Sequence, residues 1–441
     1  MRAHVGCQRA FTSCSADQIG PGLSSATRKS MTKRVMFYCQ HILGMGHLVR
    51  SSAIVRALER DFEVLFVLGG VIPDGFSAPP GVQVIHLPPI TSDSDFTNLQ
   101  AADAAHDLEK TKQLRRDTLL SAFDAHQPDI LVTELFPFGR KQFSFELLPL
   151  LERAHQAGSG GRTMVVCSLR DILVTRKDQA EYEERVCKTV NRFYDLILVH
   201  GDSNLQQLGE TFLHATDLDC PVRYTGYVVQ QQSDTLKPTA RDSRANQVPT
   251  VIVSNGGGQP VSGHLFLENC IEAARILQSI QPLQFHIFAG PFMEEQAFQR
   301  LKHLATEVDS VSFSRYTPNL AACLAQADLS ISMAGYNTMM DILSTGVRAI
   351  VSPFTGGGDQ EQTVRANKMA QLGVLDVLTA DQLDPPQLAT AIVAALKRDP
   401  VQIAFNDQGA SNSSHILREQ FATWKPLRIT DQLERAFQLQ V

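Results

Sequence analysis

The residues best suited to chemistry lie between positions 330 and 362, where glycines, a carboxylate and amides follow apolar runs. Gly335 ends the first run, and Asn337, a favoured helix cap, follows it. The first amides of a helix have no intrahelical partner and carry the positive end of its dipole, so they suit a diphosphate. Asp341 comes four residues after Asn337, about 5.4 Å further along the same face. This spacing predicts a phosphate site beside a ribose diol.

A second polar cluster follows the next apolar run and extends this candidate site. Its glycines could bring backbone amides to a phosphate or a sugar, and its side chains offer donors and acceptors for sugar hydroxyls. The alternative is an ordinary strand–helix–strand unit with a flexible glycine loop. The features in series favour a ligand site. Its predicted binding residues are Gly335, Asn337, Thr338, Asp341, Gly357, Asp359, Gln360, Glu361 and Gln362.

Two further glycine-rich loops each follow an apolar run, at residues 255–258 and 40–47. Both are strand-to-helix turns that let a pyrophosphate approach without obstruction by side chains, although a simple tight turn is the alternative. A dinucleotide fingerprint would require a third glycine where Val49 stands, so NAD is disfavoured. The predicted donor-binding residues of these loops are Gly44, Gly46, Asn255, Gly256 and Gly257.

The elements that must position these loops alternate between strand-like and helical patterns, as in a parallel α/β fold. The predicted strands are 35–39, 63–68, 82–87, 129–134, 163–168, 195–200 and 222–225, and then 250–254, 284–289, 310–313, 328–333, 348–352 and 374–378. Ligands of such folds bind at the carboxyl ends of strands, where all these loops fall. The predicted fold is therefore α/β, with two doubly wound Rossmann-like domains facing across a cleft.

A chain of 441 residues exceeds the size of a single core, so two domains are expected. The predicted division is a disordered leader at 1–30, an N-terminal domain at 31–229, a linker at 230–249, a C-terminal domain at 250–413 and a helix at 414–441 that packs back on the N-terminal domain. The leader is basic and poor in acids, so a transit peptide is an alternative, as is translation from Met31.

Composition excludes several classes of protein. The net charge is −6 and there is no long basic run, which argues against a nucleic-acid partner. No apolar run reaches the roughly 18 to 20 residues that span a bilayer. The eight cysteines are scattered without paired short spacings, which is typical of reduced thiols in a cytosol. The expected location is cytoplasmic, with peripheral contact at the inner face of the membrane as a further expectation.

Residues 332–341 and 359–362 resemble the C-terminal donor domain of GT-B glycosyltransferases, in particular glycosyltransferase family 28. That family includes the N-acetylglucosaminyltransferase of peptidoglycan synthesis. The resemblance implies a GT-B fold and favours a UDP-sugar donor. It implies that Asp341, where the family usually has Glu, holds the ribose hydroxyls. It also implies that Glu361 and Gln362, matching paired glutamines, touch the donor sugar, and that Tyr316 and Thr317 hold the base.

His47 matches the histidine that ends the first loop in this family and faces its cleft. Sugar transfer with inversion requires the acceptor hydroxyl to lose a proton, which a neutral histidine can accept. The helix start is expected to lower the pKa of His47 and keep it neutral. His47 is therefore the predicted catalytic base, although a hydrogen bond to phosphate or acceptor is the alternative role. Other candidate bases are His41, Glu134, Asp171 and Asp202.

The acceptor side is predicted from the segment 135–145, which places four phenylalanines around two cations. Such a loop could bind a lipid-linked or aromatic acceptor or touch an anionic membrane, although such residues are more often simply the core and rim of the next helix. The predicted acceptor-side residues are Glu134, Arg140, Arg170 and Asp171.

The predicted function is transfer of a hexosyl group from a nucleoside-diphosphate sugar to a hydroxyl acceptor. Loop amides and helix termini would stabilise the leaving group, so neither a metal nor another cofactor is expected. The expected partners are the sugar donor and an acceptor, for which a lipid-linked molecule is one candidate. Two alternatives stay open: a nucleotide-sugar hydrolase or 2-epimerase, and a catalytically silent nucleotide-binding protein.

Overall fold

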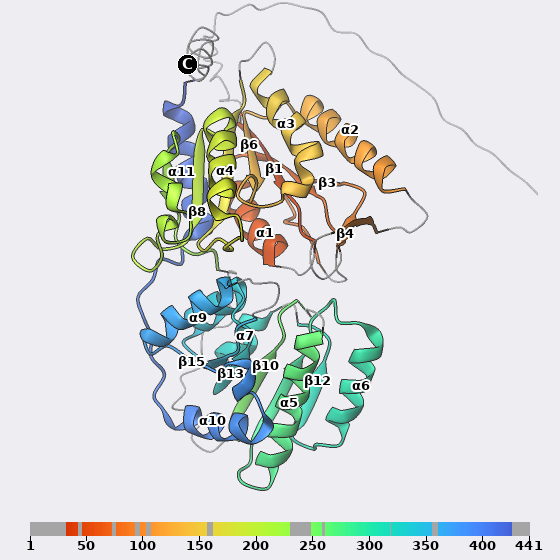
Figure 1. Ribbon diagram of the computed structural model, residues 1–441, viewed down its shortest axis with the longest axis vertical. Coiled ribbons are helices and arrows are strands. Elements are labelled where there is room, and N and C mark those ends of the chain that lie inside the picture. Colours follow the sequence, from red (N-terminus) through yellow and green to blue (C-terminus); the bar gives the residue numbers. More distant parts are fainter. Residues whose placement is uncertain are drawn as a thin grey trace, which may run out of the picture. The chain divides into compact units, whose positions relative to one another are not determined.

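Two parallel β-sheets, each covered by helices on both faces, form the part of the chain that the computed structural model describes (Figure 1). The described residues are 32–42, 46–72, 76–92, 98–102, 107–156, 162–229, 248–257, 261–317, 319–354 and 360–425. The predicted leader, positions 230–247 of the predicted linker, and the predicted site residues Gly44, Gly357 and Asp359 lie outside these ranges.

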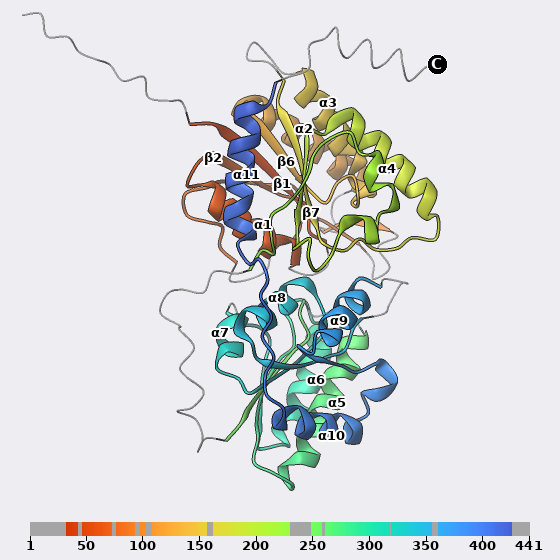
Figure 2. The same ribbon diagram turned by 90° about the vertical axis from the view of Figure 1, so that its left-hand side faces the viewer.

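The first sheet has the order β3-β2-β1-β6-β7-β8-β9, with every neighbouring pair parallel. Its strands are β1 (Arg34–Cys39), β2 (Glu63–Leu68), β3 (Gln83–His86), β6 (Ile130–Glu134), β7 (Met164–Arg170), β8 (Leu196–His200) and β9 (Val222–Tyr224). Alternate residues of β1 are buried on opposite faces, because both faces are covered. One face packs on α2 (Leu108–His126), α3 (Ser144–Gln156) and α4 (Gln179–Phe193), and the other on α1 (Gly46–Leu58) and α11 (Gly409–Thr423) (Figure 2).

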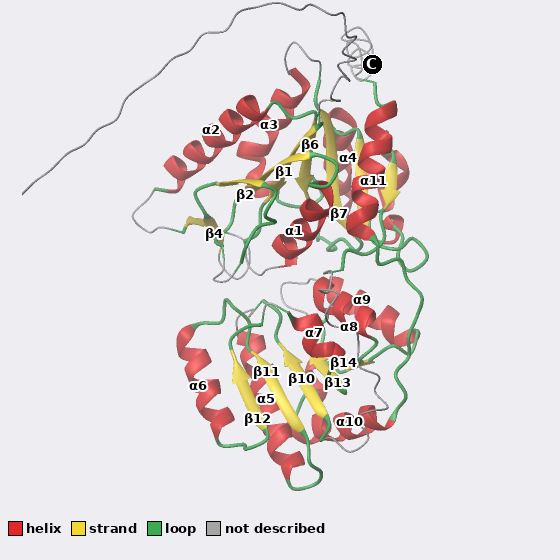
Figure 3. Cartoon of the chain, turned by 180° about the vertical axis from the view of Figure 1, so that it is seen from behind, coloured by secondary structure: helices red, strands yellow, loops and turns green. Residues whose placement is uncertain are grey.

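The second sheet has the order β12-β11-β10-β13-β14-β15 and is also parallel throughout. Its strands are β10 (Thr250–Ser254), β11 (Gln284–Phe288), β12 (Val311–Ser314), β13 (Leu329–Ser332), β14 (Arg348–Val351) and β15 (Asp376–Val377). One face packs on α5 (Val261–Gln278), α6 (Glu295–Thr306) and α10 (Pro385–Lys397). The other packs on α7 (Leu320–Ala325), α8 (Tyr336–Thr345) and α9 (Glu361–Gln371) (Figure 3).

Each sheet has a point where the strand order reverses, and these points position the site. In the first sheet the reversal lies between β1 and β6, where Tyr38 pairs with Thr133. In the second it lies between β10 and β13, where Ser254 pairs with Ser332. Loops that leave adjacent strands at such a point run in opposite directions and leave a crevice, which is where doubly wound folds bind their ligands.

The predicted strands are confirmed in type and place, with ends that differ by at most two residues. A short antiparallel pair, β4 (Ile90–Ser92) and β5 (Leu99–Ala101), was not predicted, because strands of three residues carry no recognisable pattern. The last described helix, α11, begins at Gly409, before the predicted start at 414, and ends at Thr423. In the described part of the chain, no helix is both long enough and apolar enough to cross a membrane.

Helix α11 packs on the first sheet although it follows the second sheet in sequence. Leu417 belongs to the core cluster that contains the buried residues of α1. The Ser414 hydroxyl donates to Asp61 at 2.6 Å, and Arg418 pairs with the same carboxylate at 3.1 Å. The chain therefore crosses between the two sheets twice, and both sheets belong to one compact unit that begins at Lys33.

Candidate functional site

The first part of the candidate site is built where β1 and β6 end beside each other. Helix α1 begins at Gly46, soon after β1, so His47 is its second residue. Glu134 is the last residue of the neighbouring strand. Parallel strands end at the same edge of a sheet, so two residues that are 87 positions apart meet there.

His47 and Glu134 form a hydrogen-bonded pair. The Nδ1 atom of His47 lies 2.7 Å from Oε1 of Glu134. Arg50, one turn further along α1, donates to the same carboxylate oxygen at 2.5 Å. The Glu134 side chain is fully buried, whereas 18% of the His47 side chain is exposed. Two predicted bases, His47 and Glu134, are therefore hydrogen-bonded to each other, and only His47 reaches the surface.

Burial and charge together set the protonation of this pair. Burial lowers the pKa of His47 to about 4, even though the charge of Glu134 acts in the opposite direction. Burial also disfavours the carboxylate of Glu134, but His47 and Arg50 hold its pKa well below the usual range. Glu134 is therefore ionised at neutral pH and His47 is neutral. A carboxylate can only accept, so Nδ1 carries the proton and Nε2 keeps the lone pair that a general base needs.

The second part of the site is the start of α8, and here one prediction is wrong. Asn337 was expected to cap this helix, but the cap is Gly335 and the first helical residue is Tyr336. Tyr336 is buried and its hydroxyl donates to the carbonyl of His200 at 2.9 Å, so tertiary packing holds it in the first turn. The amides without an intrahelical partner are then those of Tyr336, Asn337 and Thr338, which still suit an anion. The predicted helix end at Gly346 is confirmed.

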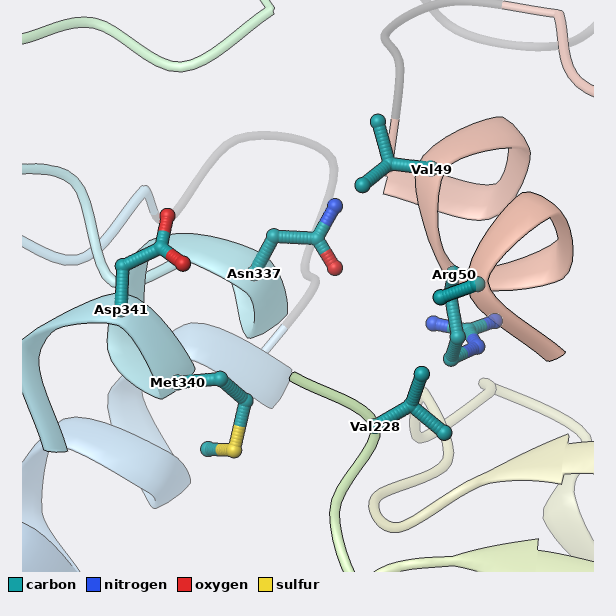
Figure 4. A pocket seen from close by; sticks show the side chains of 7 residues that line it. Val49, Arg50, Val228, Asn337, Met340 and Asp341 are labelled. Carbon is teal, nitrogen blue, oxygen red and sulfur yellow. The ribbon is translucent and has the colours of Figure 1, made fainter. Parts of the chain in front are cut away.

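Asp341 and Asn337 line a pocket together with residues of α1, as Figure 4 shows. Only 6% of Asp341 is exposed, and burial raises the pKa of its carboxyl group to about 7. No donor among the described residues reaches this carboxylate. The empty volume among the lining residues is about 210 Å³. The lining residues are Val49, Arg50, Ala53, Val228, Asn337, Met340 and Asp341.

The backbone at the ends of β10 and β13 is unobstructed. A Cβ atom at Gly335 or Gly256 would meet no other atom within 4 Å. Gly256 has a φ of +62°, in the left-handed region that favours glycine, and Gly257 follows it in the same turn. Asn255 is buried, and its Oδ1 atom has no partner among the described residues. These features are compatible with the predicted approach of a phosphate to both loops.

The predicted donor-sugar residue Glu361 forms an ion pair with the predicted acceptor-side residue Arg170. Arg365 links Glu361 to a second such residue, Asp171. Arg365 donates to Asp171 at 2.8 Å and to Glu361 at 2.9 Å. Asp171 and Arg365 are almost completely buried. Asp171 is therefore held by a cation and shielded from solvent, which makes it a poor candidate for the base.

The remaining predicted donor residues lie in varied surroundings. The Gln362 side chain accepts a hydrogen bond from the amide of Phe354 at 3.0 Å, which joins α9 to the residues just after β14. Gln360 is exposed at the start of α9. Tyr316 is partly exposed and Thr317 follows it in the loop after β12. The structure thus leaves Gln360 and Tyr316 accessible to a ligand.

The other candidate bases take part in local structure. The Nε2 atom of His41 lies 2.8 Å from the carbonyl oxygen of Val71. Asp202 accepts hydrogen bonds from the amides of Asn204 and Asn406. Within the described ranges, no group of three or more His, Cys, Asp and Glu side chains is arranged to hold a metal ion.

The phenylalanine-rich segment after β6 is part of the core. Phe136, Phe138 and Phe143 are buried in the cluster beneath α2, α3 and α4. The interpretation that these rings belong to the core is therefore confirmed for three of the four, and contact of those three with a lipid or a membrane is not supported. Arg140 lies in the same segment with a left-handed φ of 60°, and the charge of Glu134 acts on it. It is the residue of this segment that remains a candidate for contact with an acceptor.

Sequence reasoning missed three residues of the site: Arg50, Tyr336 and Arg365. The two guanidinium groups lie over the ring of Tyr336, at 5.1 Å and 5.5 Å from its centroid. Arg50 had one detectable signal, its position three residues after His47, which places both on one helix face. The contact of Tyr336 with two cations had none, because it depends on how three helices pack.

Comparison with known proteins agrees with this architecture. Residues 256–419 match the glycosyltransferase family 28 C-terminal domain. The UDP-N-acetylglucosamine--N-acetylmuramyl-(pentapeptide) pyrophosphoryl-undecaprenol N-acetylglucosamine transferase of Syntrophotalea carbinolica is 32% identical over 91 residues, which are 21% of this chain and 25% of the relative. The chain spans 23% to 47% of the length of the curated relatives that it matches first.

Two solved structures show the same fold at low sequence identity. MurG from Acinetobacter baumannii has 14% identity and a TM-score of 0.52, over 89% of this chain and 100% of that chain. A UDP-glucosyltransferase from Polygonum tinctorium has 15% identity and a TM-score of 0.54, over 89% and 99%. The predicted GT-B fold, with two Rossmann-like domains, is therefore confirmed. In sequence, residues 256–419 resemble the C-terminal domain of glycosyltransferase family 28, and this range includes every strand of the second sheet except β10.

Proposed function

We propose that this protein transfers a hexosyl group from a nucleoside-diphosphate sugar, with a UDP-sugar favoured, to a hydroxyl group of an acceptor. The observation that carries the proposal is the His47–Glu134 pair, a neutral imidazole oriented by a buried carboxylate. General acid–base catalysis requires such a base, with its lone pair directed at the reacting proton. The match of residues 256–419 to a family 28 domain supports the choice of reaction.

The donor would bind at the carboxyl end of the second sheet. Amides at the start of α8 and in the loop of Asn255, Gly256 and Gly257 would hold the diphosphate. Asp341, one turn into α8, would accept hydrogen bonds from the ribose hydroxyls. The loop of Tyr316 and Thr317 would hold the base, and Gln360 and the segment after it would contact the sugar. The predicted residues Gly44, Gly46, Gly357 and Asp359 belong to the same proposal.

The reaction would be a direct displacement at the anomeric carbon. The Nε2 atom of His47 takes the proton of the acceptor hydroxyl as its oxygen forms a bond to this carbon. The bond between the same carbon and the diphosphate oxygen breaks, and the electron pair leaves with the nucleoside diphosphate. Glu134 stabilises the imidazolium that forms, because its charge lies 2.7 Å from Nδ1. Backbone amides and the α8 dipole stabilise the leaving group, so no step requires a metal.

In this scheme residues 31–229 form the acceptor-side domain, residues 250–413 the donor domain, and 230–249 the linker between them. Residues 414–441 would return to the acceptor side, where α11 packs on the first sheet. The name of the relative from Syntrophotalea carbinolica, which specifies a pyrophosphoryl-undecaprenol acceptor, supports a lipid-linked acceptor here. A cytoplasmic protein that contacts the membrane peripherally would meet such an acceptor, and this location is part of the proposal. Arg140 and Arg170 are the cations proposed to face such an acceptor.

A binding panel followed by product analysis tests the proposal. A ligand at 100 times its dissociation constant stabilises the folded state by about 2.7 kcal/mol, so a UDP-sugar should raise the melting temperature when GDP-, ADP- and TDP-sugars raise it less. Incubation with a labelled donor and candidate acceptors should then give a labelled glycoside. Free sugar or an epimer as the main product would contradict transfer, and a panel without any stabilising nucleotide sugar would contradict the donor site.

A further inference from the structure

Arg50 occupies the centre of the site, although neither its type nor its position was predicted to matter. Its side chain is 2% exposed. One guanidinium nitrogen lies 2.5 Å from Oε1 of Glu134 and 3.3 Å from Nδ1 of His47. His47 and Arg50 therefore both contact Oε1 of Glu134. Its other oxygen, Oε2, has no partner among the described residues.

The other side of the Arg50 guanidinium group faces the donor-side helix. Its Cζ atom lies 5.1 Å from the ring centroid of Tyr336, the first residue of α8. The Tyr336 hydroxyl donates to the carbonyl of His200 and accepts from the amide of Val228, so the ring has a fixed position. Arg50 also lines the pocket that contains Asp341, as Figure 4 shows. It thus contacts the pair and the first turn of α8 at once.

We propose that Arg50 is a positioning residue for the transfer reaction, which fixes the Glu134 carboxylate beneath His47 and couples the pair to the first turn of α8. The proposal rests on the proposed function, because it assigns Arg50 a role in that same site. Its geometric basis is a guanidinium group that donates to Glu134 at 2.5 Å and lies over the ring of Tyr336, with Cζ 5.1 Å from the ring centroid.

The charge of Arg50 has a consequence with a definite sign. The charged groups that act on His47 are Glu134, Arg50 and Arg140, together with Glu361 on α9. Without Arg50 the environment of the pair becomes more negative, so the pair binds a proton more readily. A proton on Nε2, or one on Glu134 that displaces the Nδ1 proton to Nε2, removes the lone pair in either case. Loss of Arg50 should therefore move the acid limit of activity to higher pH.

The test compares four proteins over a pH series. In Arg50→Met we expect kcat to fall at least tenfold and the acid limb of kcat/KM to rise by about one pH unit. In Arg50→Lys, which keeps the charge and loses the planar fork, we expect a similar fall in kcat with the limb unmoved. Arg56→Met, an exposed arginine on the same helix, is the matched control and should behave as wild type. A wild-type kcat and limb in Arg50→Met would overturn the proposal, as would a wild-type kcat in Arg50→Lys.

A second readout does not depend on turnover. With the histidines labelled by ¹⁵N, the side-chain signals of His47 report its protonation, and a His47→Gln variant assigns them. The midpoint should rise by about one pH unit in Arg50→Met, and an unchanged midpoint overturns the proposal even in an active enzyme. If wild type transfers no sugar, the proposed function fails while this titration still decides the role of Arg50. If Arg50→Met does not fold, the Arg50→Lys arm decides it.

Two variants of Tyr336 test whether its contact with Arg50 couples the His47–Glu134 pair to α8. Tyr336→Phe and Tyr336→Leu both lose the hydroxyl hydrogen bonds, but only the first keeps the ring beneath Arg50. We expect kcat to be at least threefold lower in Tyr336→Leu than in Tyr336→Phe, consistent with a stacking contribution worth a few-fold in rate. Equal kcat values in the two variants would show that the ring contact does not couple the helix to the pair.

Discussion

Two buried carboxylates, Glu134 at the end of the first sheet and Asp341 on the helix after β13, have opposite surroundings. Glu134 accepts hydrogen bonds from His47 and Arg50, which keep it ionised despite complete burial. Asp341 receives no hydrogen bond from the described residues, and burial raises its pKa to about 7. The protein therefore supplies hydrogen-bond donors to the carboxylate of Glu134 from its own side chains. In our proposal a ribose diol supplies the donors for the other, so the first acts in chemistry and the second in binding.

The largest effect should come from His47, where the comparison predicts loss of chemistry without loss of binding. In His47→Ala we expect kcat to fall about 10³-fold, within the range that general bases contribute, and donor affinity to stay within about twofold. Steady-state kinetics and calorimetric titration with the nucleoside diphosphate measure the two quantities. A fall in kcat of less than tenfold would mean that another group takes the proton.

The buried carboxyl group of Asp341 should make the free energy of unfolding of the ligand-free protein depend on pH. Its folded-state pKa of about 7 lies above the ordinary value of 3.8, so the folded protein binds the proton more tightly and loses stability as pH rises from about 4 to about 7. Asp341→Asn removes this contribution. The free energy of unfolding of the variant, relative to wild type, should therefore increase by about 2–3 kcal/mol between pH 5 and pH 8.

Urea denaturation at the two pH values measures this difference, with the exposed Asp399→Asn as the control. The control should change stability by less than about 0.5 kcal/mol at either pH. A variant of Asp341 whose relative stability does not depend on pH would show that the carboxylate is already compensated in the free protein, and the contrast with Glu134 would disappear.

The strands of both sheets could be predicted because the apolar runs that form them are local features of the sequence. Strands that are buried on both faces, such as β1 and β2, are nearly continuous apolar runs that are followed by glycine or polar residues. The loops that follow them then fall at the carboxyl edge, so His47, Glu134 and Asp341 could be found without knowledge of the packing. The match of the predicted and observed strands follows from this one regularity.

The environment of these residues could not be predicted, because it depends on contacts between distant segments. Asn337 has the propensity of a cap, but packing of Tyr336 against the first sheet extends the helix and leaves Gly335 in that position. For the phenylalanines after β6 the sequence favours the core, but only the helices that cover them establish it. Arg50 and Arg365 are ordinary helical arginines in sequence, and only the fold directs both at one ring.

Glu134 should have a smaller effect than His47, because it acts through that residue. Glu134→Gln keeps a hydrogen-bond acceptor for Nδ1 but removes the charge, so we expect kcat to fall about 10- to 30-fold. The charge of Glu134 raises the pKa of His47, so its loss should move the acid limb of kcat/KM to lower pH, opposite to the shift expected for Arg50→Met. The exposed Glu152→Gln is the matched control. A limb that does not move in Glu134→Gln would mean that Glu134 carries no charge in the native protein.

The smallest effect separates the role of Asp341 in binding from any role in folding. At pH 8 the carboxyl group of Asp341 is mostly ionised. Wild type should then bind UDP about tenfold more tightly than 2′-deoxy-UDP, because only UDP forms the charge-assisted hydrogen bond between the 2′-hydroxyl and Asp341. In Asp341→Asn both nucleotides should bind with nearly the affinity that wild type has for the deoxy form. This double comparison isolates the contact, because any change in helix packing weakens both nucleotides alike. Equal losses for UDP and the deoxy form in the variant would therefore place the effect of Asp341 in the helix and remove it from the ribose site.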